Sequence, residues 1–235
     1  MNLRVFSNSA MSADGKIATW RKDLIDIGSP EDQRFMSELR ARADAVVVGG
    51  QTFRNWRLPL VEDPAHLPWV RTRDRPVINA VLTRSGVASR PPDPGVFPDP
   101  RVQVLVFGAP GIDRAAHGSL FGAEVLERPD PDVRWVVSEL AARGCRSVLV
   151  EGGGAMIFQF LEADLLDEMY VTVAPLIIGG AESPSPVDGR GFDADALRRL
   201  QLLSARHVGD EMFLHYRVRR AAVAGAEGEG APGAV

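Results

Sequence analysis

Three consecutive glycines lie between a strand-like segment and a helix-like segment. Residues 148–150 form an apolar run typical of a strand buried on both faces, and residues 155–161 carry apolar side chains at helical spacing. Because glycine has no Cβ, Gly152, Gly153 and Gly154 let the backbone turn sharply and approach a ligand, while the next helix points its positive end the same way. The pattern predicts an anion site, most simply for a pyrophosphate.

Glu151 stands directly before these glycines. A carboxylate at a phosphate site is unfavourable unless it faces another part of the ligand, one that donates hydrogen bonds. We therefore interpret Glu151 as a substrate contact. The spacing differs from G-x-G-x-x-G and falls late in the chain, so we expect no standard first Rossmann unit. A glycine-rich turn also occurs in α/β proteins as a plain connection, and the pattern alone leaves both interpretations open.

Composition narrows the class of protein. The chain has 235 residues, enough for one large α/β domain, and a formal charge of −4, which argues against a nucleic-acid binder. We expect neither a membrane span nor a signal peptide, because no apolar run is long enough and strand-like sequence begins at once. One cysteine, Cys145, excludes an internal disulfide and favours a reducing cytoplasm. The four histidines show no metal-ligand spacing, so we expect no metal.

Alternating strands and helices must position the glycine turn. The predicted strands are 3–9, 45–48, 77–83, 102–107, a short one near 125, 148–150, 168–178, 200–208 and 212–218. The predicted helices are 30–42, with Ser29 as N-cap, 133–143 and 155–161, with an extra turn near Leu120. The second strand ends in Gly49-Gly50 and repeats the strand-glycine-helix pattern, whereas residues 57–75 predict a long surface loop.

This order of elements indicates a fold class. Strands that alternate with helices favour an α/β fold with a mainly parallel central sheet and helices on both faces. The last strands, with a hairpin turn at Gly209-Asp210, favour an antiparallel edge. We expect residues 1–220 to form a single domain and the alanine- and glycine-rich residues 221–235 to be a disordered tail.

Several short motifs occur together in a specific order. They are Ser7-Asn8, Met11-Ser12-Ala13-Asp14-Gly15-Lys16, Leu39-Arg40-Ala41, Val47-Val48-Gly49 with Thr52, Leu149-Val150-Glu151 with the three glycines, Leu166-Asp167-Glu168, Ala174-Pro175 with Gly179-Gly180, and Val187-Asp188-Gly189 with Gly191-Phe192. In order and spacing, over residues 3–219, the chain resembles the pyrimidine reductases of riboflavin biosynthesis. These include stand-alone enzymes and the C-terminal domain of bifunctional deaminase-reductases, with dihydrofolate reductases as more distant relatives.

The resemblance implies a dihydrofolate-reductase-like fold, NADPH as cofactor, and reduction of a ribosylamino-pyrimidine 5′-phosphate to its ribitylamino form. The hydride would go to C1′ of the opened sugar. Such a transfer needs the nicotinamide and the substrate carbon held in contact, while the cofactor supplies the difficult chemistry. The resemblance also implies a homodimer, for which the apolar late strands could supply the interface.

The resemblance assigns roles to particular residues. Those expected at the cofactor are Thr52, Thr83, Arg84, Gly152, Gly153, Gly154, Ala155 and Met156. Those expected at the substrate are Asp14, Lys16, Arg40 and Glu151, of which Asp14, Lys16 and Glu151 would be catalytic. Arg84 is a candidate for the 2′-phosphate because a guanidinium offers a fork of donors. Simpler roles stay open: strand-end hydrogen bonds for the threonines, solvation for Arg84, a salt bridge to Glu38 or Asp44 for Arg40, and a turn for Asp14.

The chain departs from the family pattern near the expected substrate. Residues 56–60 replace an Asp-Asp-Pro-x-Leu-Thr element, and residues 24–26 and Leu82 also differ from the usual pattern. Arg54 and Arg57 could replace the usual phosphate contacts, and we assign Arg57 to the substrate site. These departures make cofactor binding better supported than substrate identity.

Two other functions stay open. One is a dihydrofolate-reductase-like enzyme acting on a pterin or another imine, which would need a carboxylate in the first helix. Glu31 or Asp32 could be placed there, although we expect these acids to serve the helix start. The other is a paralogue that binds NADPH or a sugar phosphate without turning it over. NADPH and NADH, and substrates before or after deamination, are all compatible with the sequence.

Overall fold

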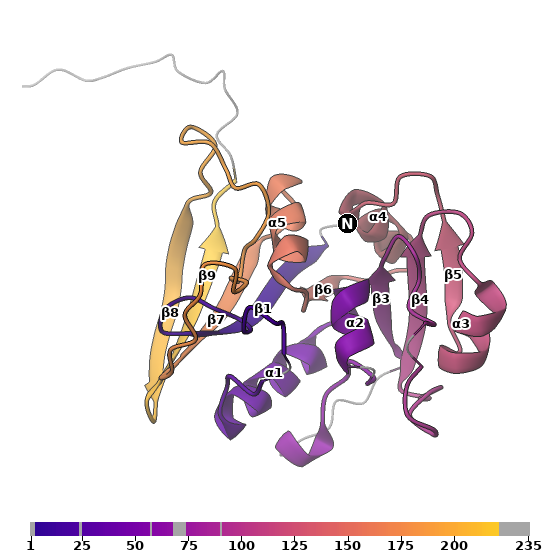
Figure 1. Cartoon of the computed structure of the whole chain (residues 1–235), viewed down its shortest axis with the longest axis horizontal. Coiled ribbons are helices and arrows are strands. Elements are labelled where there is room, and N and C mark those ends of the chain that lie inside the picture. Colours follow the sequence, from indigo (N-terminus) through magenta and orange to yellow (C-terminus); the bar gives the residue numbers. More distant parts are fainter. Residues whose placement is uncertain (1–2, 24, 57, 68–73, 90, 221–235) are drawn as a thin grey trace, which may run out of the picture.

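The computed structural model describes residues 3–23, 25–56, 58–67, 74–89 and 91–220. These form a sheet with the strand order β5-β4-β3-β2-β6-β1-β7-β9-β8 (Figure 1). The strands are β1 (Arg4–Ser12), β2 (Ala45–Gly49), β3 (Val77–Leu82), β4 (Val102–Gly108), β5 (Glu124–Glu127), β6 (Ser147–Val150), β7 (Glu168–Ala174), β8 (Leu200–Val208) and β9 (Glu211–Val218). The helices are α1 (Pro30–Arg42), α2 (Gly50–Trp56), α3 (Arg114–Phe121), α4 (Val133–Ala142), α5 (Gly154–Glu162) and the 3₁₀ turn η1 (Pro64–His66).

The sheet is parallel from β5 to β7 and antiparallel from β7 through β9 to β8. Its central strands are apolar on both sides, and Val46, Val47 and Val48 of β2 are wholly buried. A continuous β-branched run of this kind is what a parallel strand between two helix layers requires. The predicted fold class, a mainly parallel sheet with an antiparallel C-terminal edge, is confirmed.

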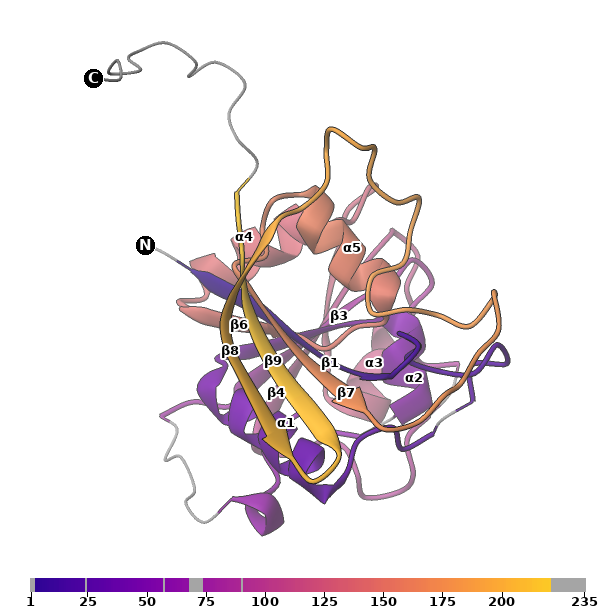
Figure 2. The same cartoon turned by 90° about the vertical axis from the view of Figure 1, so that its left-hand side faces the viewer.

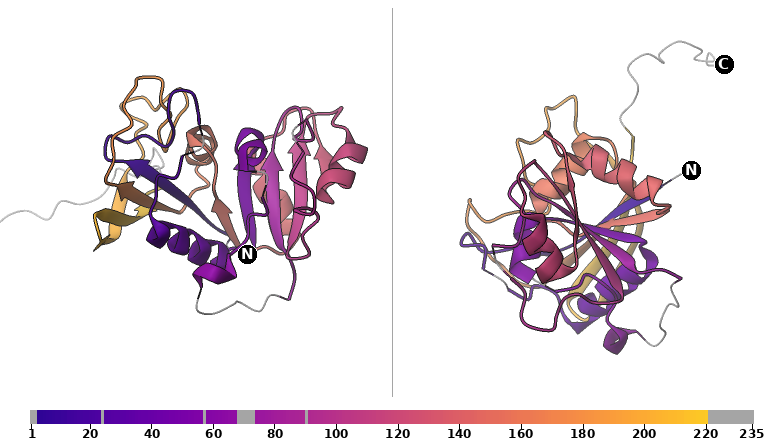
Figure 3. Two further views of the ribbon diagram at one scale, coloured as in Figure 1. Left: turned by 60° about the horizontal axis from the view of Figure 1, so that its bottom comes forward. Right: turned by 90° about the vertical axis from the view of Figure 1, so that its right-hand side faces the viewer.

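Helices cover both faces of the sheet (Figure 3). The core on one face contains Leu39 of α1, Phe53 of α2 and Phe121 of α3. The core on the other face contains Leu140 of α4 and Phe160 of α5. We call the face that packs against Leu39, Phe53 and Phe121 the α1 face. Side chains of β1, β6 and β7 point alternately to this face and to the face covered by α5.

The connections out of β2 and β6 diverge. From β2 the chain passes through α2 to β3, and from β6 it passes through α5 to β7, which lies on the other side, beyond β1. Since α2 and α5 also lie on opposite faces, a crevice is expected outside the carboxyl ends of β2 and β6. Ligands of open α/β sheets bind at such switch points, and both glycine turns of this chain are located there.

Two local predictions are confirmed in detail. The Ser29 side chain accepts hydrogen bonds from the backbone N–H groups of Glu31 and Asp32, so α1 begins at Pro30 as the sequence indicated. The hairpin between β8 and β9 turns at Gly209-Asp210, and Gly209 has φ of +59°.

Four boundaries differ from the predictions for identifiable reasons. Strand β1 continues to Ser12 because it pairs with β7 along its whole second half. Strand β7 ends at Ala174 instead of 178, because Pro175 has no N–H to donate to a strand partner. The turn near Leu120 is a full helix, α3, which Asp113 caps at its N-terminus and the left-handed Gly122 caps at its C-terminus.

The fourth difference concerns residues 58–67, which were expected in a surface loop. Leu60 and Val61 are buried, and the Asn79 side chain exchanges two hydrogen bonds with the backbone of Leu60. This segment therefore packs onto the α1 face. The expected disordered tail lies outside the described residues. Within the described part of the chain, every helix is too short or too polar to cross a membrane.

Candidate functional site

The ends of β2, β3 and β6 meet at the switch point. A Cβ built on Gly152 would lie 3.9 Å from the backbone nitrogen of Gly49, so the two glycine turns abut. The Thr52 hydroxyl lies 4.0 Å from the place of a Cβ on Gly153, and the Thr83 hydroxyl lies 2.7 Å from that of Gly50. The fold thus gathers the glycines and both threonines that were predicted to contact a cofactor.

The start of α5 is open beside Gly153 and covered beside Gly154. Gly153 is its N-cap and supplies no side chain to the first N–H groups. Ala155 is exposed, whereas Met156 donates its N–H to the Gly153 carbonyl and buries its side chain in the core. On the far side, Gly154 is covered by the backbone of Ser185 and Asp188. The space for an anion therefore lies beside Gly153 and Thr52, and Met156 contributes packing.

Glu151 and Arg40 form a buried ion pair. Arg40 Nε donates to both carboxylate oxygens of Glu151, at 2.8 and 3.1 Å, and Nη2 donates to Oε2 at 2.6 Å. The Arg40 side chain is 14% exposed and the Glu151 side chain is 10% exposed. Arg40 therefore forms a salt bridge, as one of the predictions allowed, but its partner is Glu151. Glu38, one of the two acids considered, pairs with Arg34 instead. Two predicted site residues 111 positions apart are thus held together at the mouth of the glycine turn.

Asp14 and Lys16 are bound to the segment after β7. The Asp14 carboxylate accepts hydrogen bonds from the Ser12 hydroxyl and from the N–H groups of Ile178 and Gly179. These bonds, the Ser12 hydroxyl foremost, lower the pKa of Asp14 to about 2. Lys16 Nζ donates to the Ser183 carbonyl at 3.0 Å. Among the described residues, no hydrogen bond or ion pair joins either side chain to Glu151, so their catalytic role stays a prediction.

The residues at the end of β3 are partly engaged. Thr83 donates its hydroxyl hydrogen to the Gly86 carbonyl. This is the strand-end hydrogen bond that was the simpler prediction for Thr83. Arg54 also donates to Gly86, at 2.8 Å, and to Gln51. Arg84 follows Thr83 directly and is exposed. Arg57 lies outside the described residues, so its assignment to the substrate stays a prediction.

Thr172 and Asn8 were not singled out as ligand contacts by the sequence, and as a ligand contact Asp32 was considered only as a carboxylate for a pterin. Asp32, Thr172 and Asn8 each bury a side-chain oxygen that has no hydrogen-bond partner among the described residues. Ser29 caps α1, and Glu31 pairs with Arg34 and Arg206. Asp32 was expected to serve the helix start, but its side chain is buried. Only Thr172 carried a signal in the sequence, because it is a polar residue between two valines of β7, whereas Asp32 lies in α1 and Asn8 lies between two serines.

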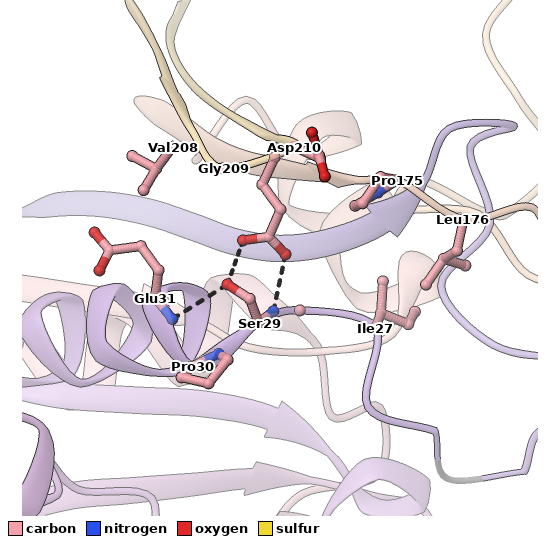
Figure 4. A pocket seen from close by; sticks show the side chains of 11 residues that line it. Ile27, Ser29, Pro30, Glu31, Pro175, Leu176, Val208, Gly209 and Asp210 are labelled. Carbon is pink, nitrogen blue, oxygen red and sulfur yellow. Dashed lines mark hydrogen bonds between the residues drawn. The ribbon is translucent and has the colours of Figure 1, made fainter.

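A cavity of about 490 Å³ lies beside the start of α1 (Figure 4). Ile27, Pro175, Leu176 and Val208 line it, and the Ser29 N–H and hydroxyl donate to Glu211 at 2.8 and 2.5 Å. None of the glycine-turn residues lines this cavity. It is therefore separate from the switch point.

The sheet order, the helices on both faces and the glycine turns at the switch point define a dihydrofolate-reductase-like α/β protein. The dihydrofolate reductase of Enterococcus faecalis has this fold, with a TM-score of 0.51 and 14% identity over 92% of this chain and 96% of that chain. The chain belongs to the RibD C-terminal domain family, whose sequence model matches residues 4–214.

Two relatives are similar over most of this chain. The 2,5-diamino-6-ribosylamino-4(3H)-pyrimidinone 5′-phosphate reductase of Methanothermobacter thermautotrophicus is 31% identical over 228 residues, which cover 92% of this chain and 98% of that protein. A structure of Acinetobacter baumannii RibD has a TM-score of 0.71 at 23% identity and covers 93% of this chain, but this chain spans only 58% of that one. Reductases of this fold imply a nicotinamide cofactor. A Cβ on Gly153 would meet only the Thr52 hydroxyl within 4 Å, so this side of the glycine turn is open.

Proposed function

We propose that this chain is an NADPH-dependent reductase of riboflavin biosynthesis that converts a ribosylamino-pyrimidine 5′-phosphate into its ribitylamino form. The observation that carries the proposal is the position of the Glu151–Arg40 pair directly before the glycine turn at the switch point. A cofactor held at Gly152 and Gly153 and a substrate at Glu151 would be neighbours. The name of the Methanothermobacter relative, which matches over nearly its full length, supports the same reaction.

On the cofactor side, the residues of this chain would bind and orient NADPH. Thr52, Gly152, Gly153, Gly154 and Ala155 would hold the diphosphate with backbone N–H groups and a hydroxyl. Thr83 would border the same site from the end of β3, and Met156 would brace the turn from the core. When bound, NADPH supplies the hydride.

On the substrate side, the chain fixes a charged pair in place. Glu151 would accept hydrogen bonds from the pyrimidine or the ribose, and Arg40 would keep its carboxylate charged and correctly oriented. Asp14 and Lys16 would complete the site from the loop after β1, and Arg57 would contact the substrate. These groups hold the reacting carbon of the substrate in contact with the cofactor, which is the main requirement of a hydride transfer.

The test is an activity assay on purified protein. NADPH oxidation is followed with the ribosylamino-pyrimidine phosphate, and separately with dihydrofolate, and NADPH binding is measured by titration. Oxidation with the sugar phosphate, and release of its ribitylamino product, is the expected result. Turnover of dihydrofolate alone would favour the pterin reductase, for which the buried Asp32 is the specific observation. Tight NADPH binding without either reaction would favour a non-catalytic paralogue.

We propose that Arg84 selects NADPH over NADH. Its exposed guanidinium beside the end of β3 offers a charged fork to the 2′-phosphate, which NADH lacks. A charge-assisted hydrogen bond contributes roughly 1.5–3 kcal/mol, so Arg84→Gln should lower the ratio of kcat/KM for NADPH over NADH about tenfold or more. The control is Arg114→Gln, an exposed arginine paired with Glu127 away from this turn. An unchanged ratio in Arg84→Gln would remove the assignment.

We also propose a cytoplasmic homodimer of one domain, residues 1–220, that joins through β8. This strand is one edge of the sheet (Figure 2). Its Leu200 and Leu202 side chains are exposed. An apolar edge strand of this kind is a site for pairing with another chain. Leu202→Lys should shift the mass in solution, measured by light scattering, from dimer to monomer, whereas the neighbouring Gln201→Lys should not. A wild-type monomer at all concentrations would contradict the proposal.

A further inference from the structure

A buried histidine supports the turn that follows β3. Residues 83–87, which we call the β3 turn, are buried except for Arg84 and Ser85. His117 of α3 is 2% exposed, and its Nε2 accepts a hydrogen bond from the N–H of Val87 at 2.8 Å. The turn that carries the exposed Arg84 therefore rests on a polar side chain inside the core.

Both ring nitrogens of His117 are engaged. A backbone N–H can only donate, so Nε2 is the acceptor and the ring carries its hydrogen on Nδ1. Nδ1 then donates to the carbonyl of Asp113, the N-cap of α3, at 2.7 Å, and this bond keeps Nε2 directed at Val87. The Asp113 carbonyl also accepts from the backbone N–H of His117. The Val87 N–H is therefore the group that would lose its partner if the ring were replaced.

The β3 turn packs closely on the ring and is held by two other contacts. Gly86 has φ of +76°, and a Cβ there would lie 2.6 Å from Cε1 and 2.7 Å from Nε2 of His117. The Gly86 carbonyl accepts from the Thr83 hydroxyl at 3.2 Å and from Arg54 of α2 at 2.8 Å. Side chains of α2 and α3 and the end of β3 thus fix the backbone of the turn before any ligand arrives.

The surroundings of His117 are otherwise aromatic. Its ring lies 6.3 Å from that of Phe121, which in turn lies 5.4 Å from the rings of Phe53 and Phe97. An apolar side chain could fill this place without burying two polar ring nitrogens, which costs free energy. The particular contribution of a histidine here is therefore its hydrogen bond to the β3 turn.

We propose that His117 is a positioning residue for cofactor selection, which fixes the β3 turn so that Arg84 meets the 2′-phosphate of NADPH. This rests on the function proposed above, and in particular on the role of Arg84. His117 acts through the backbone of the turn, without contact to the cofactor. A guanidinium on a fixed turn binds a phosphate without the entropic cost of ordering that turn. Because NADH lacks the 2′-phosphate, a loosened turn should weaken the binding of NADPH alone.

The experiment measures the Kd of NADPH and of NADH by titration, without a pyrimidine substrate, and takes the Kd of NADH over that of NADPH as the preference. His117→Phe keeps an aromatic ring but removes the acceptor for the Val87 N–H. It should lower the preference by about threefold to tenfold, because the turn must then be ordered when NADPH binds. His117→Asn, which is polar but too short to reach Val87, should lower it as well.

His117→Gln is the conservative variant. Its amide oxygen is as many bonds from the backbone as Nε2, so it can accept from the Val87 N–H and should retain most of the preference. Hydrogen exchange gives a second measurement of the same contact. The Val87 amide should exchange faster in His117→Phe than in wild type, and at a nearly unchanged rate in His117→Gln. An equal loss of preference in all three variants would contradict the proposal.

A double variant tests whether His117 acts through Arg84. In an Arg84→Gln background, His117→Phe should change the preference no further, because the group that it positions is already gone. Equal fold-changes with and without Arg84 would overturn the proposal. A preference that falls in Arg84→Gln but not in His117→Phe overturns the role of His117 and leaves the proposed function standing. Wild type that binds neither nicotinamide overturns the proposed function, and the role of His117 with it.

The control for folding is Phe121→Leu. Phe121 is 1% exposed in the same aromatic cluster and carries no hydrogen-bonding group, so this variant should lose stability without a change in preference. Denaturation midpoints of both variants show whether they are comparably destabilised. A loss of preference in His117→Phe alone would come from the β3 turn. If Phe121→Leu lowers the preference as much, general loosening of the cluster explains the effect and the proposal is wrong.

Discussion

Glu151→Ala should lower the free energy of unfolding by about 3–5 kcal/mol and lower kcat/KM by at least about 100-fold. The loss of stability follows because Arg40 would keep its charge at a 14% exposed position without the three hydrogen bonds that Glu151 accepts. The loss of activity follows because, in the proposed function, Glu151 orients the substrate edge. Chemical denaturation at neutral pH and steady-state kinetics give the two numbers.

The double variant Arg40→Met with Glu151→Leu separates the two effects. Replacing both partners of a buried pair by apolar groups should restore most of the stability, since no uncompensated charge remains, while activity stays lost. Glu38→Ala is the control, because Glu38 pairs with Arg34, which is 42% exposed, and such a pair contributes about 1 kcal/mol or less. An active Glu151→Ala, or a double variant as unstable as the single one, would refute the central role of the pair.

The elements could be predicted because their signals are local. The runs 45–48 and 148–150 are apolar and β-branched, which suits only strands buried on both faces, and Ser29-Pro30 carries both the cap and the first helical residue of α1. The glycine turn after β6 also follows from residue type, since only glycine permits the close approach of the Ser185 and Asp188 backbone to Gly154.

The sheet order and the pairing of site residues have no local signal. Strand β1 inserts between β6 and β7, and this depends on contacts between residues more than 140 positions apart, such as Val5 with Val148. Glu38 and Asp44 are close to Arg40 in the sequence and were possible salt-bridge partners. The way α1 packs on the sheet directs Arg40 to Glu151 instead. For the same reason, the direction of Asp32 toward Thr172 could not be read from the spacing of acids in the first helical turn.

Substitution by alanine should lower the stability of the fold at Gly154 but leave it almost unchanged at the adjacent Gly153. A Cβ on Gly154 would overlap the Ser185 carbonyl oxygen and lie 2.6 Å from the Asp188 nitrogen, so Gly154→Ala should lose about 1–3 kcal/mol of stability or more. Gly153 has φ −61° and ψ 167°, which alanine adopts freely, and its Cβ would meet only the Thr52 hydroxyl at 4.0 Å. Gly153→Ala should fold within about 1 kcal/mol of wild type.

The same methyl group should nevertheless stand where the cofactor phosphate approaches the backbone. Gly153→Ala should therefore raise the Kd for NADPH at least about tenfold, measured by titration of the reduced nicotinamide fluorescence. Gly118→Ala in α3 is the control, because its Cβ would meet no atom within 4 Å, and it should leave the Kd unchanged. Since Gly153→Ala is expected to be folded, an unchanged Kd could not be explained by damage to the protein. It would mean that the dinucleotide binds away from this turn, because the methyl group occupies the open space beside Thr52.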